Sequence, residues 1–347
     1  MKNKSHLIKL TFILCVFLSP LRLLAQEDIG DLFKAGPEDA TKLVNAYINP
    51  LFKGLGVGLN SGWTNTAKAK KPLRFDLRFT ATAAFVPSSD QAYDVNTLGL
   101  KNIRAVDKFK SVGPTAFGDK TDGPLMELYD SSFPDPAPAQ FKLPQGTGIN
   151  FVPSPQVQLT IGLLKYTEVS LRLVPDVKIE DSKLNLFGIG AKFEILPILM
   201  GKKEKVIPID VAIAVGYTTL NYNLPVKFNN QTNANQTVEV KLKGYSAEAI
   251  VSKKLKFFTP FASVGYNSSE SELKAVGTYQ FDVPVTPLTP TGKKTYVDPI
   301  NIKQTDVEGV KASLGFQLNL AFFRIYSSYT VSKYSYFNAG IGFGIGK

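Results

Sequence analysis

The stretch Arg74–Phe85, RFDLRFTATAAF, alternates between apolar and polar side chains with a period of two. In an extended chain, successive side chains point to opposite faces, so Phe75 and Leu77 share one face. Asp76 and Arg78 share the other face. This pattern predicts a β-strand with one apolar face and one polar face, and it is not typical of a helix.

The same alternation recurs along the chain, in segments of about 9–13 residues. The clearest repeats lie in 156–163, 168–173, 187–194, 209–218, 245–252, 310–319 and 337–345. A tilted strand of this length crosses a bilayer, whereas strands of soluble proteins average about 5–6 residues. The polar faces carry glycine, small residues and charges, as a wet lumen would, and aromatic residues cluster near the segment ends. The sequence therefore predicts an all-β fold, an antiparallel transmembrane β-barrel.

Connection lengths constrain the number of strands. The segments near 86–155, 221–237 and 267–306 are long, and bacterial barrels place their long connections outside and their short turns in the periplasm. A first crossing strand at 73–85 gives ten strands. Counting Leu55–Asn65 and Thr97–Val106 as strands gives twelve. We expect ten to twelve strands, and fourteen is the largest number considered. Both the ten- and the twelve-strand solutions place the two chain ends in the periplasm.

The N-terminal residues have the features of an export signal. Lys2, Lys4 and Lys9 precede the apolar run Leu10–Leu18, which is too short to span a membrane as a helix. Cleavage is expected after Ala25. Residues 1–25 are thus predicted to be a signal peptide, and the mature chain is expected in the cell outer membrane.

The 347-residue chain contains one histidine, His6, and one cysteine, Cys15, and both fall in the predicted signal. The mature chain would then lack imidazole and thiol groups, which excludes most nucleophilic catalysis and His/Cys metal sites. Cleavage removes four basic and no acidic residues, so the net charge falls from +11 to +7. No nucleic-acid motif accompanies the remaining basic residues. We expect no enzyme activity, no cofactor, no metal and no nucleic-acid partner.

Residues 36–53 form the one clear helical pattern. Gly36 and Pro37 mark its start, acidic residues follow in the first turn, Pro50 is expected to kink it, and Gly54 is expected to end it. Two interpretations stay open for the region 26–54: a plug inside the lumen, or a periplasmic lead-in packed under the barrel. Residues 55–347 are then assigned to the barrel.

The inferred lumen faces carry charges of both signs. The candidate lumen-lining residues are Arg74, Asp76, Arg78, Glu168, Arg172, Lys192, Asp210, Glu248 and Lys311. Such mixed charges favour a structural lattice of ion pairs, with a selectivity filter and an acid–base site as the alternatives.

Several short motifs resemble an uncharacterised family of Bacteroidetes outer-membrane barrels. They are Glu38–Leu43, Ala46–Tyr47, Pro50–Phe52, Gly54, Gly62–Ala67 and the stretch Gly309–Gly346. The resemblance implies a barrel in the outer membrane and carries no activity with it. A plug-like segment before a barrel is also similar, in architecture alone, to the long-chain fatty-acid transporter family.

Two functions follow as expectations. The first is passive passage or uptake of small molecules, hydrophobic ones among them, with outer-membrane lipid and a small hydrophobic ligand as the expected partners. The alternative is a barrel that transports nothing and serves as a surface structural or adhesion protein, or as an anchor for a secretion apparatus.

Overall fold

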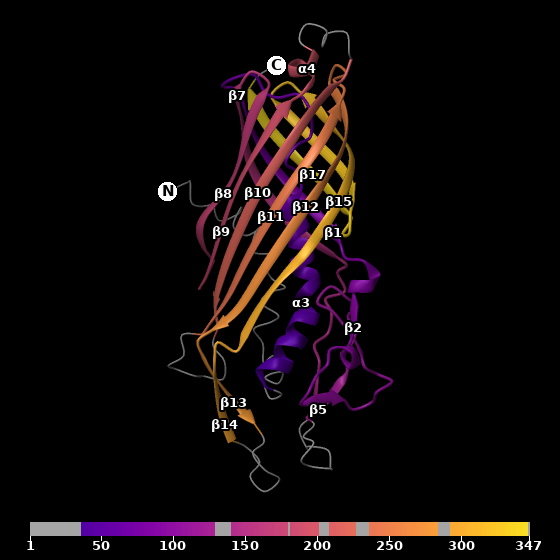
Figure 1. The fold of residues 1–347 in the computed structure, drawn as a ribbon, viewed down its shortest axis with the longest axis vertical. Helices are drawn as coiled ribbons and strands as arrows, with labels where there is room; N and C mark the ends of the chain where they lie inside the picture. The colour runs from indigo at the N-terminus through magenta and orange to yellow at the C-terminus, as the bar shows by residue number, and fades with distance from the viewer. Residues whose placement is uncertain are drawn as a thin grey trace.

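The computed structural model describes residues 36–128, 140–179, 181–200, 208–226, 236–283 and 292–345. The predicted signal peptide, with His6 and Cys15, lies outside these residues. Within them, the alternating segments form one closed barrel of ten antiparallel strands (Figure 1). The strands are β1 (Phe75–Phe85), β7 (Phe151–Leu164), β8 (Thr167–Ile179), β9 (Ser182–Glu194), β10 (Asp210–Pro225), β11 (Thr237–Ser252), β12 (Phe258–Val276), β15 (Ile300–Leu320), β16 (Phe323–Val331) and β17 (Tyr336–Ile345).

Barrel strands that follow one another in sequence pair throughout, and the first strand, β1, closes the ring by pairing with the last, β17. Phe79, for example, lies opposite Val157 on one side and Ile341 on the other. The ten-strand solution is therefore confirmed, and the larger counts are wrong. Leu55–Asn65 is part of a helix and the bend that follows it, and Thr97–Val106 lies outside the barrel wall.

The two ends of the barrel differ. One end, here the short-turn end, carries the turns at 165–166, 253–257 and 321–322, the last described residues of β17, and the short helix α4 (Leu196–Met200). At the other, the long-segment end, β1 is followed by β7, β10 by β11 and β12 by β15, and the longest connections in sequence join these strands (Figure 1). These connections are shorter than the sequence predicts, because the strands beside them are longer. Within the segment 267–306, for example, β12 extends to Val276 and β15 begins at Ile300.

The long connections contain small elements of their own. Residues 86–150, here the cap, hold η2 (Ser88–Asp90), β2 (Ala92–Asp94), η3 (Val95–Thr97), β3 (Ile103–Ala105), β4 (Val112–Pro114), β5 (Leu125–Leu128) and β6 (Gln140–Lys142). In the cap, β2 pairs with β4, and β5 pairs with both β3 and β6. β13 (Thr278–Val283) and β14 (Gly292–Val297) form a separate hairpin beyond the barrel.

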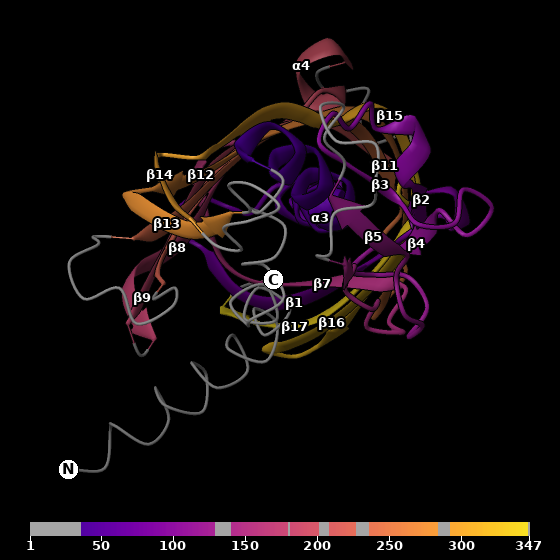
Figure 2. The same ribbon diagram turned by 90° about the horizontal axis from the view of Figure 1, so that it is seen from below.

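Helix α3 (Pro37–Asn60) lies inside the ring of strands, as the view along the barrel shows (Figure 2). It contacts β1, β7, β10, β11, β12 and β15. Among the described residues, no helix combines the length and the apolar character that a membrane span requires.

The helix continues past Gly54, where the sequence pattern expected it to end, and stops at Asn60. Glycine recurs at three alternate positions in this part of the helix, where it comes close to the wall. A Cβ on Gly54 would collide with Val152 of β7, one on Gly58 with Ser154, and one on Gly56 with Ser269 of β12. The glycines therefore serve close packing in a narrow lumen and do not act as a stop signal.

After α3, residues 61–72 run in a non-helical conformation along the lumen to the short-turn end. There Leu73, with a positive φ of 63°, turns the chain into β1. The chain therefore begins its described course at the long-segment end, and β17 finishes at the short-turn end. The chain thus crosses the lumen once before its first strand, and the two chain ends, which the sequence predicts on one side, lie outside the described residues.

Candidate functional site: the occupied lumen

The structure places most of the predicted lumen residues in the barrel interior. The buried ones are Asp76, Arg78, Glu168, Arg172, Lys192, Glu248 and Lys311. Asp210 is partly buried at the short-turn rim. Arg74 precedes β1 and is exposed, so it does not join the interior group. The partners of the interior residues come in large part from the end of α3 and from residues 61–71, here called the strap.

Glu194 of β9 binds the strap near the short-turn end. Its carboxylate lies 3.0 Å from the Lys68 ammonium and accepts a hydrogen bond of 2.6 Å from the Ala69 backbone N–H. The same Lys68 lies 3.4 Å from Asp210 of β10. One lysine of the strap therefore joins two neighbouring strands.

Glu168 and Lys192 form a buried pair at 2.8 Å, with each side chain no more than 5% exposed. Both also bind the strap. Glu168 accepts a hydrogen bond of 2.9 Å from the Lys70 backbone N–H. Lys192 donates to the backbone carbonyls of Thr66 and Lys68, at 2.7 and 3.0 Å. Because buried charges are tolerated only when paired and hydrogen-bonded, the strap completes the stabilisation of this pair.

Asp76 of β1 is fully buried and has several cationic neighbours. It pairs with Arg324 of β16, and it lies 3.6 Å from Arg78 and 3.7 Å from Lys70 of the strap. The Tyr326 hydroxyl donates to the same carboxylate at 3.0 Å. The negative charge of Asp76 is therefore balanced by two arginines of the wall and by one lysine of the strap.

Trp63 of the strap is packed between a cation and a thin part of the wall. The guanidinium carbon of Arg172 lies 3.7 Å from the ring centroid. The ring also lies against Gly190 and Gly216, which pair with each other across β9 and β10. A Cβ on Gly190 would come within 2.7 Å of the ring, and one on Gly216 would collide with it. The ring therefore occupies a space that only these glycines leave open.

Two wall cations also hold the C-terminal end of α3. Arg172 donates to the Leu59 carbonyl at 2.9 Å and to the Ser61 carbonyl at 2.7 Å. Lys311 donates to the Asn60 carbonyl at 3.4 Å and pairs with Glu248 at 3.2 Å. The last carbonyls of a helix lack internal partners and carry partial negative charge, so cations are favoured here.

At the long-segment end, α3 binds the cap and the β16–β17 loop through Asp90. The Lys53 ammonium lies 2.7 Å from its carboxylate, and the Tyr334 hydroxyl donates to it at 2.6 Å. Burial works to raise the pKa of Asp90, but the hydrogen bonds from Lys53 and Tyr334 hold that pKa below its ordinary value. Burial and the hydrogen bond to Asp90 together raise the pKa of the Tyr334 hydroxyl.

Sequence reasoning missed the residues of the strap that meet the wall, above all Trp63 and Lys68. The available signal was a single tryptophan followed by a cluster of lysines, directly before the first strand. The alternation of 187–194 and 209–218 predicts that Gly190 and Gly216 face inward, but their partner Trp63 lies more than 120 residues away in sequence.

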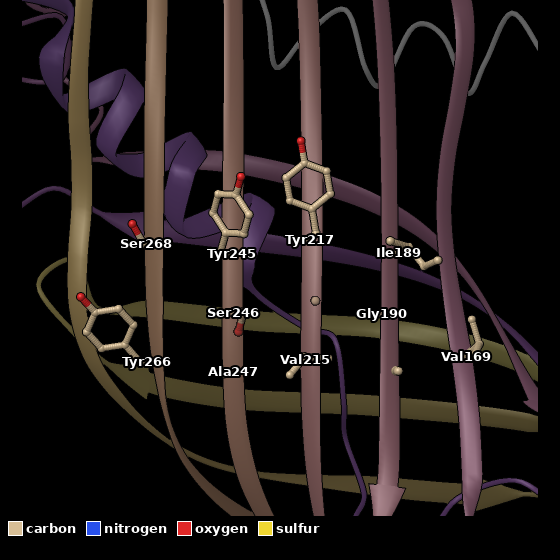
Figure 3. A pocket seen from close by; sticks show the side chains of 12 residues that line it. Val169, Ile189, Gly190, Val215, Tyr217, Tyr245, Ser246, Ala247, Tyr266 and Ser268 are labelled. Carbon is tan, nitrogen blue, oxygen red and sulfur yellow. The ribbon is translucent and has the colours of Figure 1, made fainter.

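A cavity opens on the outside of the wall. It is an apolar depression of about 530 Å³ on the outer face of β8 to β12 (Figure 3). Ile189, Val215, Tyr245 and Tyr266 line it, and each is between 45% and 48% exposed. Tyr217 and Tyr245 lie side by side there, with ring centroids 5.0 Å apart.

Within the described residues, no three His, Cys, Asp or Glu side chains gather as metal ligands would.

Solved structures with a similar barrel have very different sequences. One is the outer membrane protease OmpT from Escherichia coli, with 10% identity, 82% of this chain and 100% of that chain covered, and a TM-score of 0.34. The translocator domain of the autotransporter NalP from Neisseria meningitidis has 9% identity, with 85% and 93% covered and a TM-score of 0.31. A mutant of the monoaromatic hydrocarbon channel TodX has 8% identity, with 84% and 75% covered and a TM-score of 0.27.

No curated protein matches this sequence. The model of a protein family of unknown function, DUF6588, matches residues 1–345, which is nearly the whole chain. The chain therefore belongs to the DUF6588 family.

Proposed function

We propose that the protein is an outer-membrane barrel sealed by its own N-terminal segment, and that it serves as a surface platform without an open pore. An apolar belt on the outer wall supports the membrane placement. Val215, Val264, Leu314 and Ile341 point outward and are 47%, 60%, 71% and 41% exposed. Large apolar side chains exposed in this number on every side are costly in water and favourable in lipid.

The occupied lumen is the observation that carries the proposal. α3 fills the half near the long-segment end, and the strap continues to the short-turn end. If α3 and the strap left the lumen, the buried Arg172 and Lys192 would lose their carbonyl acceptors. Buried charges that lose partners cost several kcal/mol each, so the sealed state is strongly favoured.

The platform role rests on how the cap is held. The Ala116 N–H donates to the Tyr47 carbonyl of α3 at 2.9 Å, and the Tyr47 hydroxyl donates to the Gln145 carbonyl at 2.7 Å. Asp39 accepts the backbone N–H groups of Lys101 and Asn102 at 3.0 and 2.7 Å. The element that fills the lumen thus also positions the cap.

Planar-bilayer recording of the purified protein tests the sealed lumen. We expect no steady conductance from the wild type, and brief openings from a Trp63→Ala/Arg172→Ala variant, whose lumen loses two large side chains. Lys110→Ala, on an exposed loop of the cap, is the matched control and should remain silent. A wild type that conducts steadily would contradict the proposal, as would recovery of the protein in the soluble periplasmic fraction.

A second candidate function is the passage of small hydrophobic molecules. The apolar depression on the outer wall favours it, because its floor includes Gly190 and Gly216, directly behind which the Trp63 ring lies. A molecule could enter from the lipid side only if Trp63 moved. Uptake of a radiolabelled aromatic hydrocarbon into cells with and without the protein tests this function, and equal uptake would exclude it for that compound.

A further inference from the structure

The chain enters the barrel lumen at the long-segment end and leaves it at the short-turn end. Gly36 lies beside Asn102 of the cap and the Tyr296 hydroxyl of β14, both at the long-segment end. From there the chain runs through the lumen and leaves it at the short-turn end, where the Leu73 N–H donates to the Gly162 carbonyl at 2.9 Å.

The long-segment end has the character of an outer face. Bacterial barrels carry their long connections outside and their short turns in the periplasm. The outward side chains of the long strands support the same assignment. On β11 they change from Tyr245 to Lys243 and Lys241, and on β12 from Tyr266 to Glu270. Tyrosine marks a membrane–water boundary, so the strands emerge into water at this end.

We infer that the barrel displays its own N-terminal side on the cell surface, with the lumen as the route. The inference rests on the membrane placement proposed above and adds a direction to it. From Gly36 onward the chain enters the lumen at the outer face, although synthesis and export deliver it from the periplasmic side. The polar strap cannot cross lipid by itself, because nothing there satisfies its backbone groups. The barrel must therefore admit this segment before β1 and β17 close around it.

This inference assigns a further activity to the barrel, the surface delivery of whatever sequence precedes Gly36. Delivery needs no energy source besides folding, because the strap gains its ion pairs and carbonyl contacts only when it lies in the lumen. The ladder between β1 and β17 and the contacts of Arg172 with α3 then retain it there.

Single-cysteine labelling in a Cys15→Ser background tests the direction. Glu38→Cys probes the start of α3, where the native side chain is 53% exposed, and Lys71→Cys probes the exposed end of the strap. Phe109→Cys is the control on the cap, where the native residue is 98% exposed. Heat-dependent gel mobility confirms that each variant has folded. Cells are treated with a membrane-impermeant maleimide before and after permeabilisation.

We expect Glu38→Cys and Phe109→Cys to react on intact cells and Lys71→Cys to react only after permeabilisation. An epitope tag inserted between Gln26 and Glu27 should likewise bind antibody on intact cells. Labelling of Lys71→Cys alone on intact cells would overturn the inference, and so would labelling of Phe109→Cys without Glu38→Cys. Either result leaves the sealed lumen intact, since the absence of conductance does not depend on direction.

Discussion

The guanidinium carbon of Arg172 lies 3.7 Å from the centroid of the Trp63 ring, inside a barrel wall thinned by two glycines. This contact joins the strap to β8 at mid-lumen, and the same arginine holds the last carbonyls of α3. The lumen is therefore closed by specific contacts between wall and strap.

Replacing Trp63 by alanine should destabilise the folded barrel by about 3–5 kcal/mol, the usual cost of a large aromatic truncation in a packed interior. Trp63→Phe should cost less because much of the ring contact remains. Urea unfolding in lipid vesicles, followed by heat-dependent gel mobility, measures both variants. Equal stability of the alanine variant and the wild type would show that the ring is not packed as described.

Gly216→Ala should also destabilise the wild type, by about 1–3 kcal/mol, because the added methyl collides with the Trp63 ring. In a Trp63→Ala background the same change should be nearly neutral. The difference is a coupling free energy between two residues far apart in sequence. If the losses of unfolding free energy from Gly216→Ala and Trp63→Ala simply add in the double variant, the Trp63 ring does not lie against Gly216.

The sequence predicted the wall better than the lumen contents, for a physical reason. Alternation is a local property, so the inward direction of Asp76 and Arg172 follows from their neighbours in the chain. The helix boundary could not be predicted in this way, because Gly54 is a stop signal by local rules and a close-packing residue beside Val152. Arg74 continued the alternation but lies one residue before β1, since Leu73 turns the chain there.

Lys192→Met should destabilise the barrel by about 3–5 kcal/mol, because Glu168 would remain buried without its cation. The double variant Glu168→Gln/Lys192→Met should recover part of that loss. Lys142→Met is the matched control, since its ion pair with Asp122 is 63% and 53% exposed and such pairs contribute about 0–1 kcal/mol. Similar losses for Lys192→Met and Lys142→Met would contradict the buried pairing.

Acid should loosen the contact of α3 with the cap. The pKa of Asp90 is held below its ordinary 3.8, so the folded protein binds fewer protons than the unfolded chain near that pH. The stabilising contribution is therefore present above pH 3.8 and is lost as the pH falls through the lower folded value. Limited proteolysis of the cap between pH 6 and pH 3 measures this, and Asp90→Asn should cleave readily throughout. A wild type whose cleavage is independent of pH would show that Asp90 does not hold this contact.

The position of the strap against β1 can be tested by a disulfide. The Ser61 hydroxyl lies 2.7 Å from that of Thr82, which faces the lumen, whereas the neighbouring Ala83 faces outward. With the predicted signal removed, no native cysteine competes. Mass spectrometry of the protein from oxidised cells should find a 61–82 disulfide in Ser61→Cys/Thr82→Cys and none in Ser61→Cys/Ala83→Cys. A folded Ser61→Cys/Thr82→Cys barrel with both thiols free would contradict a lumen occupied by its own N-terminal segment.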